Sequence, residues 1–246
     1  MEKVYAKPAS LLNIPLHYCP GCTHGIAHKL IAECIDEFGI REKTIGVAGI
    51  GCSFLNYFDI DVIGAAHGRA PATASGVRRV QPDAFIFTYQ GDGDCSTIGA
   101  AEALHAAARG ERVTTFMINN GVFAMTGGQK SATTLLGQRT TTTQDGREAK
   151  RDGIPIKFAE IIAQVPGAAY VARGALNSIP NIAKAKKYIK KAIELQLEGK
   201  GYCFVELLST CPTNWGLHPK EALKWTEEKQ IPYFPLGELK TPEEVA

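Results

Sequence analysis

Short, almost wholly apolar runs alternate with helical patterns along most of this chain. Residues 84–89 and 113–118 lack the polar alternation of a half-exposed strand, and such runs are typical of strands buried on both faces. Helical patterns lie at residues 24–38 and 96–109. This alternation predicts an α/β fold, with a mostly parallel sheet and helices on both faces. The length of 246 residues suits one domain spanning residues 1–246.

The remaining predicted elements continue the same pattern. Further strands are expected at residues 44–49, 61–66, 169–172 and 202–208, and further helices at residues 70–79, 158–164 and 179–198. Residues 127–153 are dense in Gly, Thr and charged side chains, which predicts a loop. The tail from Cys211 onward contains five prolines and is predicted to be irregular, except for a helix at residues 219–228.

Composition excludes several classes of protein. The net charge of +2, without a Lys/Arg cluster beside aromatic side chains, argues against a nucleic-acid partner. No apolar run is long enough to cross a bilayer, and the N-terminus lacks the apolar core of a signal peptide, so we expect a cytoplasmic protein without membrane contact. Thiols stay reduced there, so the seven cysteines indicate metal or redox chemistry rather than disulfides.

Gly91-Asp92-Gly93-Asp94 follows a predicted apolar strand and precedes a helix. A glycine turn before a helix is an anion site, and a carboxylate there requires a bridging cation, which for phosphate oxygens is typically Mg²⁺. Asn120 lies 28 residues later at the end of the next strand, where it could add a second oxygen ligand. Other phosphate-binding patterns are absent, and an ordinary tight turn is the alternative.

Four cysteines lie in loops at the ends of predicted elements: Cys19, Cys22, Cys52 and Cys211. Four thiolates suit Zn²⁺ or a [4Fe–4S] cluster, and one Cys-x-x-Cys pair with two distant single cysteines favours the cluster. A thioredoxin-like pair would leave Cys52 and Cys211 without a role. Cys34 and Cys203 are expected in the core, and the role of Cys95 is open.

These motifs together resemble the thiamine-diphosphate-binding β subunit of the 2-oxoacid:ferredoxin oxidoreductases. The resemblance runs from His17 to Gly237, nearly the whole chain. Besides the cysteines and Gly91-Asp92-Gly93-Asp94, it rests on three further motifs: Gly49-Ile50-Gly51-Cys52-Ser53, His67-Gly68-Arg69-Ala70 and Met125-Thr126-Gly127-Gly128-Gln129. The implied fold is the thiamine-diphosphate-binding fold.

The resemblance also implies roles for individual residues. Mg²⁺ would be held by Asp92, Asn120 and the carbonyl of Val122, and a [4Fe–4S] cluster by Cys19, Cys22, Cys52 and Cys211. His67 and Arg69 resemble active-site residues. The cofactor-binding residues would be Gly51, Cys52, Ser53, His67, Gly68, Gly91, Asp92, Gly93, Asp94, Asn120, Val122 and Thr126.

The implied activity is the coenzyme A-dependent oxidative decarboxylation of a 2-oxoacid to acyl-CoA and CO₂, with electrons passed through the cluster to ferredoxin. An α subunit would supply the pyrimidine-binding half of the site and its glutamate, and ferredoxin-like and γ subunits are further expected partners. Thr134-Leu135-Leu136-Gly137-Gln138 and the motif starting at Cys211 are similar to the branched-chain (2-oxoisovalerate) subgroup. The apolar residues 54–58 would suit a hydrocarbon substrate tail or ordinary core packing.

Several alternatives stay open from the sequence. The same chemistry could act on 2-oxoglutarate or pyruvate. A non-oxidative thiamine-diphosphate lyase would need no cluster. A module stabilised by zinc on the four cysteines would have no enzymatic role.

Overall fold

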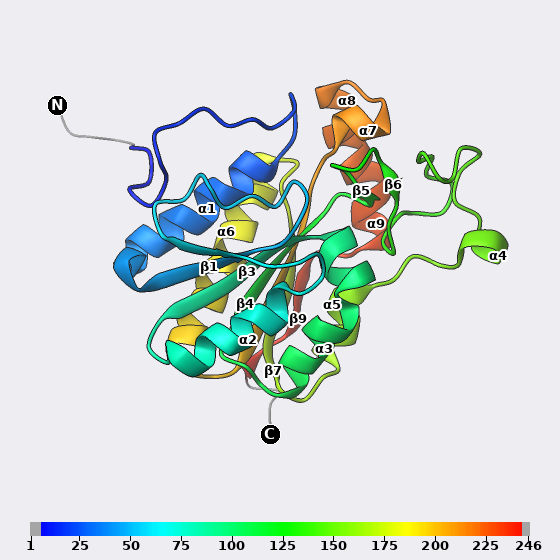
Figure 1. The fold of residues 1–246 in the computed structure, drawn as a ribbon. Helices are drawn as coiled ribbons and strands as arrows, with labels where there is room; N and C mark the ends of the chain where they lie inside the picture. Colours follow the sequence, from blue (N-terminus) through cyan, green and yellow to red (C-terminus); the bar gives the residue numbers. More distant parts are fainter. Residues whose placement is uncertain (1–5, 243–246) are drawn as a thin grey trace.

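A seven-stranded sheet forms the centre of the chain in the computed structural model, which describes residues 6–242 (Figure 1). The strand order is β2-β1-β3-β4-β8-β7-β9, and every neighbouring pair is parallel except β7 and β9. The strands are β1 (Thr44–Ala48), β2 (Asp61–Gly64), β3 (Phe85–Gly91), β4 (Thr114–Asn119), β7 (Ala168–Ala175), β8 (Tyr202–Leu208) and β9 (Gly237–Lys240). The predicted mostly parallel α/β sheet is confirmed.

The central strands are buried on both faces, as their continuous apolar runs predict. All residues of β4 and β8 are buried. Phe85, Phe87 and Tyr89 of β3 pack into one hydrophobic layer, whereas Ile86 packs into the layer on the opposite face. Successive side chains of a strand point to opposite faces, so each face needs its own helices.

Two helical layers cover the sheet (Figure 1). α1 (His24–Phe38) and α6 (Ile179–Leu197) pack together on one face. α2 (Ala70–Val80), α3 (Ala100–Ala108) and α5 (Phe158–Ala163) cover the other. α1 ends at Gly39, which has the left-handed conformation that glycine adopts readily. No helix among residues 6–242 has the length and apolar character needed to cross a membrane.

The segment after β3 differs from the helix predicted at residues 96–109. A π-helical turn spans Gly93–Ile98 before α3, and the N–H of Gly99 donates to the carbonyl of Asp94 at 2.9 Å. A side chain at Gly99 would collide with the backbone of Gly68, because a Cβ would lie 2.5 Å from that carbonyl oxygen. The wide turn therefore accommodates a close approach of two loops at the end of the sheet.

The tail after Cys211 is more regular than predicted, although the helix predicted at residues 219–228 is confirmed by α8 and the helical turn that follows it. The chain forms α7 (Pro212–Trp215), α8 (Pro219–Trp225), a π-helical turn (Thr226–Gln230) and α9 (Ile231–Tyr233), then adds β9 to the sheet edge. The prolines of α7 and α9 misled the prediction because they occupy the first turn of their helix, where the missing N–H costs nothing. The other short elements are a 3₁₀ turn (Arg41–Lys43), β5 (Val122–Phe123), β6 (Gln129–Lys130) and α4 (Ala149–Asp152).

The carboxyl ends of the central strands meet at one edge of the sheet. Gly91 of β3 pairs with Ile118 of β4, and Asn119 of β4 pairs with Leu208 of β8. Ala48 of β1 pairs with Tyr89 of β3. The loops that carry Cys52, Asp92, Asn120 and Cys211 therefore begin side by side, as expected for a ligand site in a parallel sheet.

Candidate active site

A cleft opens at the carboxyl ends of the strands and encloses about 470 Å³ of empty volume, its open mouth included. We call it the cofactor cleft. Its lining residues are His24, residues 50–53, His67, residues 91–94, Asn120 and residues 122–126. The cleft thus brings together every residue of the predicted cofactor-binding set except Gly68.

Asp92 lies in the turn after β3 and is only 1% exposed. Its Oδ2 accepts hydrogen bonds from the hydroxyls of Ser131 at 2.5 Å and Thr133 at 2.6 Å. Its Oδ1 is buried and has no hydrogen-bond partner among residues 6–242. Burial raises the pKa of this carboxyl to about 6, although the hydrogen bonds from the hydroxyls of Ser131 and Thr133 lower it. A buried carboxylate oxygen without a donor is costly unless a cation meets it, so Asp92 fits a metal ligand.

Asn120 lies across the same cleft and is 5% exposed. Its Oδ1 accepts the backbone N–H of Val122 at 3.2 Å, which leaves a second lone pair free for a cation. Gly121 has φ +70°, so the turn between these residues needs glycine. The indole N–H of Trp215 donates to the carbonyl of Asn120 at 3.1 Å. Oxygen donors from Asp92, Asn120 and Val122 are the type that Mg²⁺ prefers.

Asp94 is buried, and both of its carboxylate oxygens accept hydrogen bonds from this chain. Oδ1 lies 2.5 Å from His67 Nδ1 and accepts the backbone N–H of Gly68 at 2.7 Å. Oδ2 accepts the side-chain amide of Gln90 at 2.5 Å. Asp94 therefore orients His67, which lines the cleft, while Gly68 lies behind it. Gly68 has φ +80°, and a Cβ there would lie 2.7 Å from Ile98.

Arg69 does not line the cofactor cleft. It precedes α2, and its guanidinium pairs with the carboxylate of Glu102 on α3. The side chain of Arg69 is 49% exposed. Its position leaves it available at the surface beside the cleft rather than inside it.

Hydrogen bonds bring the cysteine loops together. The hydroxyl of Thr210 donates to the carbonyl of Gly21 at 2.6 Å, and the hydroxyls of Thr23 and Ser209 lie 2.7 Å apart. These contacts join the Cys19–Cys22 turn to the residues directly before Cys211. The hydroxyl of Tyr18 donates to the carbonyl of Cys52 at 3.1 Å, which attaches the third loop.

The four thiols also interact electrostatically. Burial raises the pKa of Cys22 to about 12 and that of Cys52 to about 11. Negative charge on Cys211 and Cys19 raises the pKa of both thiols further. Burial likewise raises the pKa of Cys211, and charge on Cys19 adds to it. Thiolates gathered in this way are unfavourable without positive charge among them, so the set fits a cationic group.

The geometry of the described residues favours neither zinc nor a cluster. No three or more Cys, His, Asp or Glu side chains among residues 6–242 form a group that could hold a metal ion. One tetrahedral zinc ion requires its four sulfurs to lie about 4 Å apart, given Zn–S bonds of about 2.3 Å. A four-iron cluster separates its ligands more widely, because the iron atoms lie between them. The cluster and the zinc ion therefore both stay predictions for these four cysteines.

The other cysteines belong to the core. Cys34 and Cys203 are completely buried in the layer beside α1 and α6, as predicted. Cys95 is also completely buried, in the opposite layer, and does not line the cleft. Leu55 and Phe58 of the apolar stretch pack into the core, and none of residues 54–58 lines the cleft.

Sequence reasoning missed several residues of the site. His24 is 2% exposed, lines the cleft and lies 2.8 Å from the hydroxyl of Tyr89 through Nδ1. Burial lowers the pKa of His24 to about 3, so its ring is neutral at physiological pH. Ser131 and Thr133 were missed because no local pattern connects a loop hydroxyl with an aspartate 39 or more residues earlier.

The fold and the cleft define an α/β domain with a candidate ligand site at the carboxyl ends of its parallel strands. Residues 49–207 match the family described as "Thiamine pyrophosphate enzyme, C-terminal TPP binding domain". This match covers most of the chain and includes Cys52, His67, Asp92 and Asn120.

Relatives of known name identify the class of protein more specifically than the family model does. The chain is 40% identical to the ketoisovalerate oxidoreductase subunit VorA of Methanothermobacter thermautotrophicus over 96% of this chain and 52% of that protein. It is 33% identical to the 2-oxoglutarate synthase subunit KorB of Archaeoglobus fulgidus over 93% of this chain and 82% of that protein. The chain belongs to the family of 2-oxoacid:ferredoxin oxidoreductase β subunits. It spans about half the length of the ketoisovalerate relative.

A solved structure shares the fold. The 2-oxoglutarate:ferredoxin oxidoreductase from Magnetococcus marinus, with 2-oxoglutarate, coenzyme A and succinyl-CoA bound, superposes with a TM-score of 0.76 at 25% identity. The similarity covers 97% of this chain and 86% of that one. The predicted thiamine-diphosphate-binding fold is therefore confirmed.

Proposed function

We propose that this chain is the cofactor-binding β subunit of an enzyme that oxidatively decarboxylates a branched-chain 2-oxoacid, 2-oxoisovalerate, to acyl-CoA and CO₂. Electrons would pass through a [4Fe–4S] cluster to ferredoxin. The observation that carries this proposal is the unpaired, buried Oδ1 of Asp92, which lies in a cleft with Asn120 at the ends of adjacent strands.

We assign separate roles in the proposed site to several residues of this chain. Asp92, Asn120 and the carbonyl of Val122 would hold Mg²⁺ and, through it, the diphosphate. His67, oriented by Asp94, would contact the bound cofactor or substrate. When bound, thiamine diphosphate would supply an electron sink for decarboxylation, and the cluster would supply a one-electron acceptor.

The cluster ligands would be Cys19, Cys22, Cys52 and Cys211. Cys52 also lines the cofactor cleft, so the proposed cluster would lie next to the proposed diphosphate site. This adjacency supports electron transfer from one to the other within a single chain. A reducing cytoplasm remains the predicted location, because thiolate ligands persist there.

The preference for a branched-chain substrate rests on the cleft lining. Among the described residues, Ile50, Phe123 and Met125 line the cleft, and no Lys or Arg does. A second carboxylate, as in 2-oxoglutarate, would therefore meet no cationic side chain in the cleft lining, and Arg69 outside it is paired with Glu102. Identity is also higher to the ketoisovalerate relative than to the 2-oxoglutarate relative. The alternative substrate is 2-oxoglutarate, which the 33% identical relative and the similar structure favour by name.

Partner subunits complete the proposed enzyme. An α subunit would supply the pyrimidine-binding half and its glutamate, and ferredoxin-like and γ subunits would join it. Substrates would be the 2-oxoacid and coenzyme A, with ferredoxin as acceptor.

The cofactor proposal is tested by replacing Asp92. The chain is co-expressed anaerobically with its partner subunits, and thiamine diphosphate and Mg²⁺ are quantified in the purified complex. Asp92→Asn is expected to lower the occupancy of both, because the amide lacks the charge that binds the cation. The control is Asp83→Asn, at an exposed position outside the cleft. Unchanged occupancy in Asp92→Asn rejects the metal assignment.

The substrate is tested with a panel of 2-oxoacids, coenzyme A and a viologen dye as acceptor. We expect kcat/KM to be highest for 2-oxoisovalerate. A higher kcat/KM for 2-oxoglutarate or pyruvate would reassign the substrate while leaving the class of reaction intact.

A further inference from the structure

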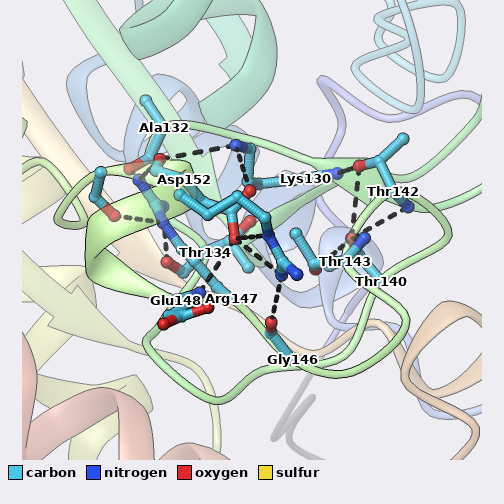
Figure 2. A network of polar contacts seen from close by, with 12 residues as sticks. Lys130, Ala132, Thr134, Thr140, Thr142, Thr143, Gly146, Arg147, Glu148 and Asp152 are labelled. Atoms are coloured by element: carbon cyan, nitrogen blue, oxygen red, sulfur yellow. Dashed lines mark hydrogen bonds and ion pairs between the residues drawn. The ribbon is translucent and has the colours of Figure 1, made fainter.

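Arg147 lies between β6 and α5, and its guanidinium is buried against main-chain carbonyls (Figure 2). The residue is 6% exposed. Its N–H groups donate to the carbonyls of Ser131 (3.2 Å), Ala132 (3.0 Å), Thr134 (2.6 Å), Gly153 (2.9 Å) and Asp152 (3.3 Å). Burial of a guanidinium is costly unless its donors are paired, and here carbonyls from two separate stretches supply the partners. Arg147 therefore fixes the course of residues 131–134.

Residues 131–134 contact both sides of the proposed cation site. Ser131 and Thr133 donate their hydroxyls to Asp92 Oδ2 at 2.5 and 2.6 Å. The hydroxyl of Thr134 donates to the carbonyl of Gly121, the residue after Asn120, at 2.5 Å. One short segment thus contacts the aspartate and the asparagine turn.

The same segment is attached to its surroundings at further points. The backbone N–H of Ala132 donates to the hydroxyl of Thr97, in the π-helical turn after Asp92, at 3.0 Å. Lys130 pairs with the carboxylate of Asp152 at 3.2 Å, and the N–H of Glu148 donates to that carboxylate at 2.9 Å (Figure 2). These contacts fold the segment 130–152 into a loop around Arg147. The hydroxyls of Ser131 and Thr133 are therefore held in position by contacts at both ends of this loop.

We propose that Arg147 is a positioning residue for the divalent-cation site, acting through Ser131 and Thr133. By holding residues 131–134, it keeps two hydroxyl donors on one oxygen of Asp92, and the other oxygen is thereby presented to the cation. Two hydrogen bonds to Oδ2 fix the rotation of the carboxylate, so the ligand does not have to be ordered when the cation binds. This inference rests on the proposed role of Asp92.

The test measures cation affinity directly. The complex of this chain with its partner subunits is stripped of divalent ions by a chelator. Mg²⁺ binding is then measured by calorimetry at saturating thiamine diphosphate, and Mn²⁺ binding by electron paramagnetic resonance. The double variant Ser131→Ala, Thr133→Val is expected to weaken cation binding about 10- to 100-fold, the usual effect of removing partners that orient a metal ligand. Arg147→Met is expected to weaken it in the same range.

Two matched variants separate positioning from general destabilisation. Thr133→Ser keeps the hydroxyl and should retain the parent affinity. Arg139→Met removes an exposed arginine of the same loop, which donates to the carbonyl of Gln144 and not to residues 131–134, and should leave affinity unchanged. A melting temperature is recorded for each variant without cation, since a purely structural role would lower that temperature without changing the dissociation constant.

Each outcome decides between the two proposals. If Asp92→Asn abolishes cation binding but the double hydroxyl variant binds normally, the positioning role is overturned and the metal assignment stands. If Asp92→Asn binds the cation normally, the proposed function fails as well. Parent affinity in Arg147→Met likewise overturns the inference. Should that variant fail to assemble, the double hydroxyl variant carries the test, and parent affinity in it overturns the inference.

Discussion

The carboxylate of Asp94 lies 2.5 Å from the Nδ1 of His67, and both residues line the cofactor cleft. A carboxylate accepts hydrogen bonds but cannot donate one, so Nδ1 of His67 carries the hydrogen. In the neutral ring, the free lone pair then resides on Nε2. Asp94 thus determines both the orientation and the tautomer of the histidine nearest the proposed chemistry.

Replacing either member of this pair should impair turnover. His67→Asn is expected to lower kcat about 100-fold, the low end of what a positioned acid–base group contributes. Asp94→Asn should lower it too, because an amide can turn a donor toward Nδ1. Since Asp94 acts through His67, the double variant should be no slower than His67→Asn alone. Multiplicative losses in steady-state kinetics would contradict a shared role.

Asn214 connects the proposed cluster with the cleft. Its side-chain N–H groups donate to Cys211 Sγ at 3.2 Å and to the carbonyl of Ala124 at 3.0 Å. Hydrogen bonds to a ligand sulfur stabilise the reduced cluster. Asn214→Leu should therefore make the potential of the cluster more negative, on the order of 40 mV if the bond contributes about 1 kcal/mol. Redox titration followed by electron paramagnetic resonance measures the shift, with Thr213→Val at the exposed neighbouring position as control. An unchanged potential would show that this hydrogen bond does not influence the iron.

A buried ion pair between Arg173 and Glu206 contacts Asn119, the residue directly before Asn120. Arg173 and Glu206 are completely buried and 2.7 Å apart, and Glu206 also accepts the side-chain amide of Asn119 at 2.6 Å. Arg173→Met leaves the charge of Glu206 without its cation, which should cost about 3–5 kcal/mol in the free energy of unfolding. Urea-induced unfolding of the purified complex measures this loss.

The matched variant removes both charges. Arg173→Met combined with Glu206→Leu should recover part of the stability, because the completely buried carboxylate is gone and only the partly exposed Glu160, the second partner of Arg173, loses its cation. Lys190→Met, which breaks an exposed pair with Glu37, should change the unfolding midpoint little. A double variant less stable than Arg173→Met would argue that the pair itself, rather than the unpaired charge, determines the loss.

The ring of Phe123 packs against Gly93, which has no side chain to displace it. A Cβ on Gly93 would lie 2.5 Å from two atoms of that ring, so Gly93→Ala must displace it. We expect about tenfold weaker retention of thiamine diphosphate, consistent with the 1–3 kcal/mol typical of overpacking. Gly64→Ala is the control, because a Cβ at that exposed strand position meets nothing within 4 Å. Cofactor release on dilution distinguishes the two variants, and equal release from both would exclude a role for this contact.

Much of the fold could be read from local sequence. The apolar runs of β3 and β4 identified buried parallel strands, since such strands need apolar side chains on both faces. The helix that ends at Gly39 followed from its periodicity and its terminal glycine. The same logic located Asp92 and Asn120, because strand ends of a parallel sheet meet at one edge. Prolines in the tail were misread because their meaning depends on position within a helix.

The chain by itself determined the order of strands and helices and the loops that carry the candidate ligands, because apolar periodicity and turn residues act over a few neighbouring positions. Only the tertiary structure decided which side chains support those ligands. Ser131 and Thr133 reach Asp92, Asn214 reaches Cys211 and Ala124, and Arg69 turns toward Glu102. Most of these contacts join segments far apart in sequence, and such hydrogen bonds leave no periodic trace because they depend on how folded loops meet.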